Sequence, residues 1–119
     1  MEIACVISQS RLRHFLTRQD GHMAAYIVAQ LDVKNTNWQK EYGPKAGALV
    51  QKHGGKILAG AESALERLEG NRALPSVLFI LEFPSLEQAK AWYNDPEYVQ
   101  MIHLRQTGAD AHIIVVEGL

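Results

Sequence analysis

Glu82 is the first residue in this sequence whose type and position suggest chemistry. It follows five consecutive apolar residues, Val77 to Leu81, in a segment with a strong strand pattern. Burial disfavours the ionised form of a carboxyl group and raises its pKa, as suits a general acid or base. Two structural roles are equally open: an ion pair or helix-capping contact with a base such as Arg105, or a strand end that reaches water. Glu82 is therefore both a candidate catalytic residue and a candidate partner of Arg105.

Tyr42 and His53 are two further candidates for moving protons. They fall on the same apolar stripe of a predicted helix, and tyrosine and histidine can both act as proton carriers in an oxygenase or isomerase. The alternative for His53 is structural, because a histidine at the end of a helix often interacts with the last carbonyl groups.

Trp92, Tyr98 and Arg105 form a candidate ligand pocket. The two aromatic residues flank a predicted helix break, and Arg105 lies seven residues beyond Tyr98, on the same side of a helix. Aromatic walls with one cation suit a small anionic or aromatic ligand. The alternative is ordinary core packing, with the Tyr98 hydroxyl bonded to the backbone.

The sequence offers no motif for a metal or a cofactor. Cys5 is the only cysteine, and His53, His103 and His112 are scattered without the spacing of metal ligands. No glycine-rich phosphate loop opens a helix, and no Gly-x-Ser-x-Gly motif is present. We therefore expect no metal and no cofactor, with haem bound through one histidine left as a minor alternative.

Composition limits the classes of partner. The 119 residues suit one domain, and 47% hydrophobic with 21% charged residues indicates a folded core. A net charge of −1 argues against nucleic acid as a partner. No apolar run approaches the roughly 20 residues that span a bilayer, so we expect no membrane segment and a cytoplasmic location.

Residues 1–22 differ from the rest of the chain. They carry three arginines and little apolar periodicity, and a strand pattern begins immediately after Met23. We interpret them as an extension outside the fold, which arose either from a start site assigned too early or from cloning. A transit peptide is the alternative, but Glu2 and Asp20 argue against it. The predicted domain is residues 23–119.

Apolar periodicity predicts a strand and a helix in the first half of that domain. Ala25–Val33 alternates as a strand with one strongly apolar face, and Asn35 and Thr36 offer N-cap chemistry for a helix. Gly43-Pro44 predicts an early kink or break in that helix, and Gly54-Gly55 predicts its end. The apolar stripe of the helix consists of Trp38, Tyr42, Ala46, Leu49, Val50 and His53.

The second half is predicted to add strands and a broken helix. Short strands are expected at residues 56–59 and 64–68, followed by a strong strand at residues 76–83. Ser85 is expected to cap the next helix, and Asp95-Pro96 to end it and start another. A closing strand is expected at residues 112–117. The order β-α-β-β-α-α-β predicts an α+β fold with helices on one face of an antiparallel sheet.

Both faces of the strand at residues 76–83 are apolar, which predicts a partner. Helices on one side of the sheet can bury only one of these faces. A second copy of the chain, packed sheet to sheet across a two-fold axis, would bury the other face. We therefore expect a homodimer.

Short motifs spread from Met23 to Gly118 form a recognisable pattern. The most specific are Glu82-Phe83-Pro84-Ser85 and Asp95-Pro96-Glu97-Tyr98. The others are Met23-Ala24-Ala25-Tyr26, Glu41-Tyr42, Gly54-Gly55, Leu68-Glu69-Gly70, Ala89, Ala91-Trp92-Tyr93, Arg105 and Val116-Glu117-Gly118. This pattern resembles the bacterial family called domain of unknown function 1330, a branch of the dimeric α/β-barrel superfamily. Residues 71–75 depart from the family pattern, so we assign no role to that loop.

The resemblance implies a ferredoxin-like βαββαβ protomer that pairs into a dimeric α/β barrel, and it does not imply an activity. Related branches include oxygenases without metal or flavin, lactone isomerases and haem-handling proteins, so the fold permits several functions. One hypothesis is a cofactor-independent oxygenase or isomerase that acts on a small hydrophobic or aromatic compound. The alternative is a non-catalytic dimer that binds a small ligand or is associated with stress. A purely structural role for the polar residues is the third possibility.

Overall fold

The structure, a computed structural model, describes residues 23–62 and 64–119. The predicted extension at residues 1–22 lies outside the described residues. The elements are β1 (Ala25–Val33), α2 (Gln39–Lys52), β2 (Lys56–Ala61), β3 (Val77–Phe83), α3 (Leu86–Tyr93), α4 (Pro96–Gln106) and β4 (Ala109–Glu117). This order confirms the predicted α+β arrangement. None of the helices in the described ranges is long and apolar enough to cross a membrane.

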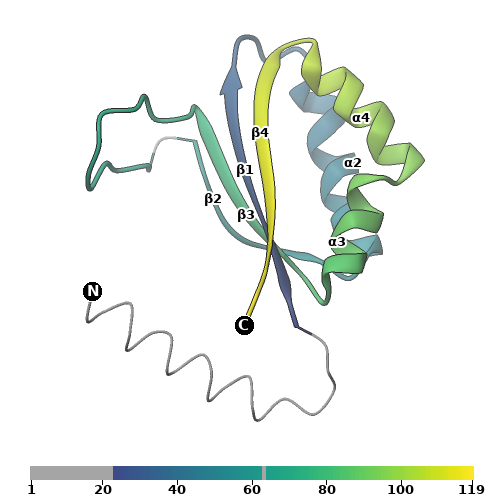
Figure 1. Cartoon of the computed structure of the whole chain (residues 1–119). Helices are drawn as coiled ribbons and strands as arrows, with labels where there is room; N and C mark the ends of the chain where they lie inside the picture. The colour runs from purple at the N-terminus through teal and green to yellow at the C-terminus, as the bar shows by residue number, and fades with distance from the viewer. Residues whose placement is uncertain (1–22, 63) are drawn as a thin grey trace.

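The four strands form one antiparallel sheet in the order β2-β3-β1-β4, with the three helices on one side (Figure 1). Strand alternation decides which residues face the helices. In β1, Ala25, Ile27 and Leu31 are buried, whereas Tyr26 and Val28 between them are half-buried. The arrangement is a ferredoxin-like fold.

The core lies between the sheet and the helices and is rich in aromatic side chains. Phe83 of β3 lies 5.5 Å from Trp92 of α3, and Trp92 stacks on Tyr98 of α4 at 4.3 Å between ring centroids. Aromatic pairs at such separations are stabilising beyond their buried area. Phe83 also explains why residue 55 is a glycine. A Cβ on Gly55 would lie 2.5 Å from the buried ring of Phe83.

Local capping chemistry places α3 and α4 as predicted. The Ser85 hydroxyl accepts a hydrogen bond from the backbone N–H of Gln88 at 3.1 Å. The Asp95 carboxylate accepts one from the backbone N–H of Glu97 at 2.9 Å, and Pro96 takes the first position of α4. Both bonds satisfy N–H groups that the first turn of a helix leaves without partners.

The expected N-cap in the first half of the domain is wrong, and so is the expected break at Gly43-Pro44; a kink there stays a prediction. The helix begins only at Gln39, and Trp38 precedes it without a side-chain cap; Asn35 instead accepts a hydrogen bond from the Asn37 backbone N–H. Gly43-Pro44 does not break α2, which continues from Gln39 to Lys52 with Pro44 inside it. Pro44 has no N–H to donate to the carbonyl of Lys40, and α2 continues in spite of this loss.

The strand expected at residues 64–68 is also absent. β3 already pairs on both sides, with β2 and β1, so a strand at residues 64–68 could only have extended the sheet at one of its edges, beyond β2 or β4. The segment instead continues into a turn, where Arg67 donates a hydrogen bond to the Gly70 carbonyl and Gly70 has a φ of +96°. Its mixed pattern lacked the β-branched residues that favour a strand.

The side of the sheet away from the helices carries exposed apolar residues. Ile114 and Val116 of β4 are 63% and 54% exposed, and they share this face with Val28 of β1 and Ile80 of β3. Contiguous apolar surface of this kind marks interaction sites. We call this surface, made of Val28, Ile80, Ile114 and Val116, the bare face.

Candidate functional site

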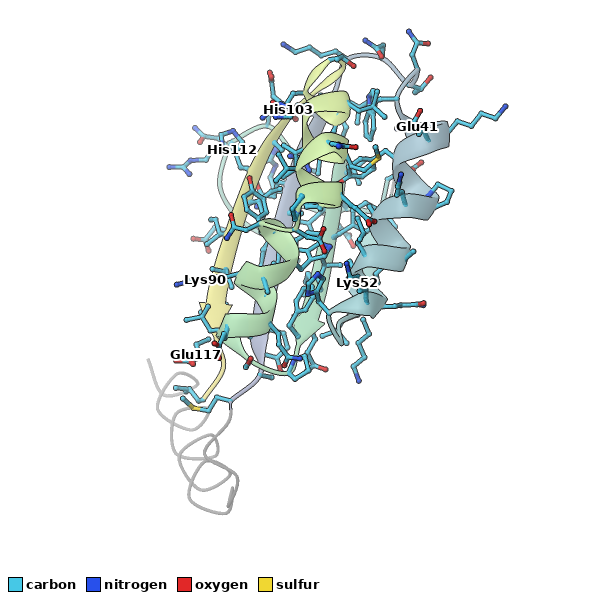
Figure 2. All side chains as sticks on the ribbon, turned by 90° about the vertical axis from the view of Figure 1, so that its right-hand side faces the viewer. Glu41, Lys52, Lys90, His103, His112 and Glu117 are labelled. Carbon is cyan, nitrogen blue, oxygen red and sulfur yellow. The ribbon has the colours of Figure 1, made fainter. Side chains whose placement is uncertain are left out.

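A cavity of about 320 Å³ lies between α2 and the helix-facing side of the sheet. Figure 2 views the helical layer and allows α2 to be followed from Glu41 near its start to Lys52 at its end. The cavity walls are mostly apolar and include Ala29, Leu31, Val77, Phe79, Leu81 and Val50. A small concave site with apolar walls is the usual setting for a small-molecule ligand.

Two tyrosine hydroxyls at this cavity share one arginine. Tyr42 of α2 and Tyr98 of α4 lie 2.7 Å apart at their hydroxyl oxygens, and both residues line the cavity. Arg105 Nη1 donates to the Tyr42 oxygen at 3.0 Å and to the Tyr98 oxygen at 3.1 Å. Tyr98 and Arg105 meet because seven residues make two turns of α4. We call Tyr42, Tyr98 and Arg105 the hydroxyl triad.

Burial controls the charge state of the triad. Tyr98 is 1% exposed and Arg105 is 2% exposed. Burial raises the pKa of Tyr98, and Tyr42 adds to this, while Arg105 acts in the opposite direction. Burial alone would lower the pKa of Arg105, but its contacts with Tyr42 and Tyr98 raise it above its usual value. At neutral pH the triad therefore holds a protonated guanidinium and a neutral Tyr98.

A count of hydrogens shows what the triad can offer a ligand. Nη1 carries two hydrogens, and it uses one on each tyrosine oxygen. One tyrosine then donates to the other, which leaves one hydroxyl hydrogen unused within the triad. Tyr98 is fully buried and Tyr42 is half-buried, so Tyr42 is the residue placed to present this hydrogen to the cavity. The adjacent positive charge makes it a stronger donor.

Trp92 completes the inner wall of the cavity. Its ring stacks on Tyr98, and its Nε1 has no hydrogen-bond partner among the described residues. Trp92 and Tyr98, two of the three residues of the predicted pocket, both line the cavity. Arg105 does not line it and reaches it only through the two hydroxyls.

Glu82 lies on the opposite side of the sheet from Arg105, so the expected contact between them is wrong. Its carboxylate is 3.3 Å from Lys56 Nζ. Glu82 lies opposite Tyr26 of β1, and both residues belong to the face of the sheet away from the helices. Alternation along β3 causes this placement, since the neighbouring Leu81 points toward the helices. Glu82 does not line the cavity.

His53 also lies away from the cavity, at the end of α2. Its Nε2 is 2.7 Å from Asp95 Oδ2, and Lys52 Nζ donates to the same oxygen at 3.1 Å. These contacts and the Glu97 N–H lower the pKa of Asp95 to about 2, with His53 the largest cause. The ring of His53 thus contacts a carboxylate rather than the helix-terminal carbonyls expected for a structural histidine. The contact ties the end of α2 to the start of α4.

Two features of the cavity were not predicted from the sequence. Glu62, just after β2, is the one carboxylate among the described residues that line it, and it is exposed. Gly43 and Gly47 of α2 also line it, and a Cβ added at either would meet nothing within 4 Å. The spacing of these two glycines, four residues apart beside Tyr42, could have indicated a hollow next to α2. Glu62 carries no such signal.

No three histidine, cysteine, aspartate or glutamate side chains within residues 23–62 and 64–119 are grouped so that they could hold a metal ion. The arrangement instead offers one polarised hydroxyl donor in an apolar cavity with a carboxylate at its edge. This combination can hold a carbonyl or phenolic oxygen and stabilise negative charge that develops on it.

Comparison with protein families gives one match, to the model described as a domain of unknown function (DUF1330), over residues 24–119. No curated protein matches the sequence at a significant level.

Solved structures give several matches. A protein of unknown function from Rhodopseudomonas palustris is 16% identical, covers 93% of this chain and 92% of its own, and has a TM-score of 0.68. A cofactor-independent oxygenase from Streptomyces nogalater is 8% identical, covers 79% and 91%, and has a TM-score of 0.57. A protein of unknown function and possible oxidoreductase from Bacteroides thetaiotaomicron is 20% identical, covers 82% and 99%, and also has a TM-score of 0.57. At these identities the likeness establishes a shared fold.

Proposed function

This chain belongs to the DUF1330 family, and from the geometry of its cavity we propose that it is a cofactor-independent oxygenase or isomerase that acts on a small hydrophobic or aromatic carbonyl compound. The observation that carries the proposal is the hydroxyl triad at the wall of an apolar cavity. The oxygenase from Streptomyces nogalater shares the fold and supports the proposal only to that extent.

The triad would stabilise the charge that such chemistry creates. A substrate carbonyl oxygen would accept the free hydrogen of Tyr42. Removing a proton from the carbon beside that carbonyl puts negative charge on the oxygen, where Tyr42 and Arg105 would stabilise it. A preorganised donor of this kind contributes roughly 10²-fold to 10³-fold in rate.

Glu62 would accept the proton from carbon. It is the carboxylate that lines the cavity, and the transfer would leave an enolate in the cavity and a carboxylic acid on Glu62. Return of that proton to a different carbon completes an isomerisation. Reaction of the enolate with dioxygen, which takes up the electrons, begins an oxygenation.

A ligand-binding protein without activity is the second candidate. Glu62 is exposed to water, and water can compete with a ligand for its carboxylate. The cavity would then select ligands whose oxygen accepts a hydrogen bond from Tyr42, without transforming them.

Proton exchange separates the two candidates. The probe is 2-tetralone, a flat ketone with acidic hydrogens beside its carbonyl, and NMR in D₂O follows their replacement by deuterium. We expect the protein to accelerate exchange, Tyr42→Phe to slow it about 100-fold, and Glu62→Gln to abolish the acceleration. Tyr93→Phe, which changes a tyrosine outside the cavity, is the matched control and should exchange like the unaltered protein.

Ketone binding with no accelerated exchange would favour the binding protein. Equal exchange by Tyr42→Phe and the unaltered protein would contradict the role of the triad. An oxygen electrode run on the same samples shows whether dioxygen is consumed and thus decides between oxygenase and isomerase.

A second copy of this chain is the proposed partner. The bare face stays uncovered in the protomer, although its residues are as apolar as those of the core. Sheet-to-sheet packing across a two-fold axis would bury it in both copies.

A further inference from the structure

We infer that the ligand is elongated: its oxygen-bearing head sits at Tyr42, and an unbranched apolar chain leaves the cavity between α2 and β2. This inference rests on the proposed function, because it uses Tyr42 as the anchor of the head. It adds the shape and class of the ligand, namely a phenol or ketone with an alkyl chain.

The first support is a second hollow that shares a wall with the cavity. A groove of about 490 Å³ lies on the outer side of the gap between α2 and β2. Gly43, Gly47, Val50 and Ile57 line both the cavity and the groove. The two hollows therefore meet at these residues, with the glycines on the α2 side and Ile57 on the β2 side.

The second support is the pair of glycines themselves. Glycine inside a helix is destabilising relative to alanine, so two glycines in α2 weaken that helix. No packing within the described chain requires them, because a Cβ at either position would meet nothing within 4 Å. Gly55 is different, since the ring of Phe83 leaves no room for a Cβ there. The open space along α2 is thus free for something outside the chain.

The third support is that the passage is apolar and that the two hollows together have the size of a ligand site. Ile57 lies on the edge strand β2 and is 56% exposed, so an apolar side chain stands open to solvent at the outlet. The cavity alone is at the lower limit of small-molecule sites, which range over about 300–1,000 Å³, and the cavity with the groove falls well inside that range. A chain of methylene groups matches an apolar passage, and the burial of each further CH₂ strengthens binding.

The test compares 4-ethylphenol with 4-octylphenol by isothermal titration calorimetry. The variant is Gly47→Leu, which fills the passage, and Lys45→Leu is the matched control because Lys45 is exposed on the same helix and lines neither hollow. We expect the unaltered protein and Lys45→Leu to bind 4-octylphenol at least 10-fold more tightly than 4-ethylphenol. Gly47→Leu should lose this gain, so that the ratio of its affinities for the two phenols falls toward one. Gly47→Ala, whose Cβ has free space, provides a variant that folds and should show a smaller loss.

The possible failures can be distinguished. Equal affinity for the two phenols in the unaltered protein, or an unchanged gain in Gly47→Leu, would overturn the inference. If 4-ethylphenol binds equally well to Tyr42→Phe, the anchor is wrong and the proposed function fails with it. If the affinity for both phenols depends on Tyr42 but not on the length of the alkyl chain, the inference of an elongated ligand is wrong and the proposed function stands.

Discussion

At the scale of single residues, the separation of Glu82 from Arg105 has a measurable consequence. Glu82 pairs with the exposed Lys56, so Glu82→Gln should lower the free energy of unfolding by about 1 kcal/mol or less. Arg105→Met removes two charged hydrogen bonds to buried hydroxyls and should cost more, about 2–4 kcal/mol. Because the two side chains lie on opposite sides of the sheet, the double variant should equal the sum of the single variants within about 0.5 kcal/mol. Denaturant unfolding of all three variants measures this, and a coupling above 1 kcal/mol would contradict the structure.

Sequence reasoning found part of the site for a physical reason and missed part for another. The sequence predicted that Tyr98 and Arg105 lie near each other, because residues seven apart in a helix fall on the same side of it. The side of Glu82 could not be assigned, because both faces of β3 are apolar and alternation alone does not say which face the helices cover. Glu62 reaches the cavity through the path of the chain after β2, which no local pattern specifies.

At the scale of elements, Asp95 links the end of α2 to the start of α4 and should make the stability of the fold depend on pH. His53 and Lys52 at the end of α2 contact its carboxylate, which also caps α4. Its folded pKa of about 2 lies below the unfolded value near 3.9, so the ionised group stabilises the fold above about pH 4. This contribution is lost as the pH falls from about 4 toward 2.

The variant Asp95→Asn isolates this effect because asparagine still caps a helix but carries no charge. We expect it to be less stable than the unaltered protein between pH 5 and 7, and the difference should shrink toward pH 2. His53→Gln should shift the loss to higher pH, since His53 is the largest cause of the lowered pKa. Urea unfolding at a series of pH values measures both. A difference that does not change with pH would show that the Asp95 charge does not stabilise the fold.

The elements that sequence predicted well are those set by local chemistry. Ser85 and Asp95-Pro96 start their helices through bonds within three residues, so their roles depend little on the rest of the fold. Residues 64–68 were assigned wrongly because a strand needs a neighbour, and that neighbour is decided by the sheet as a whole. Gly43-Pro44 was expected to kink or break the helix, and α2 continues across it without a break.

At the scale of the whole molecule, the bare face predicts a homodimer. Ile114→Glu places a charge on that face, where Ile114 is exposed in the protomer, so the variant should fold as a monomer. Leu81→Glu instead places a charge in the core beneath the helices and should prevent folding. Lys90→Glu on α3 is the control and should leave both folding and assembly unchanged. Sedimentation equilibrium with circular dichroism measures mass and folding together, and a monomeric unaltered protein at micromolar concentration would contradict the dimer.

The boundaries of the molecule stay predictions. A chain that starts at Met23 is expected to fold and dimerise like the full chain, with a melting temperature within a few degrees of it. A large loss of stability would show that residues 1–22 belong to the fold. The cytoplasmic location likewise stays a prediction.

The central claim is that the unused hydroxyl hydrogen of the triad selects ligands by one oxygen atom. Isothermal titration calorimetry with 2-tetralone and with tetralin, which lacks only the carbonyl oxygen, tests it directly in the unaltered protein and in Tyr42→Phe. We predict that the unaltered protein prefers the ketone by at least 10-fold, about 1.4 kcal/mol, and that Tyr42→Phe binds the two compounds with similar affinity. Equal binding of both compounds by the unaltered protein, or a preference that survives in Tyr42→Phe, would contradict the account.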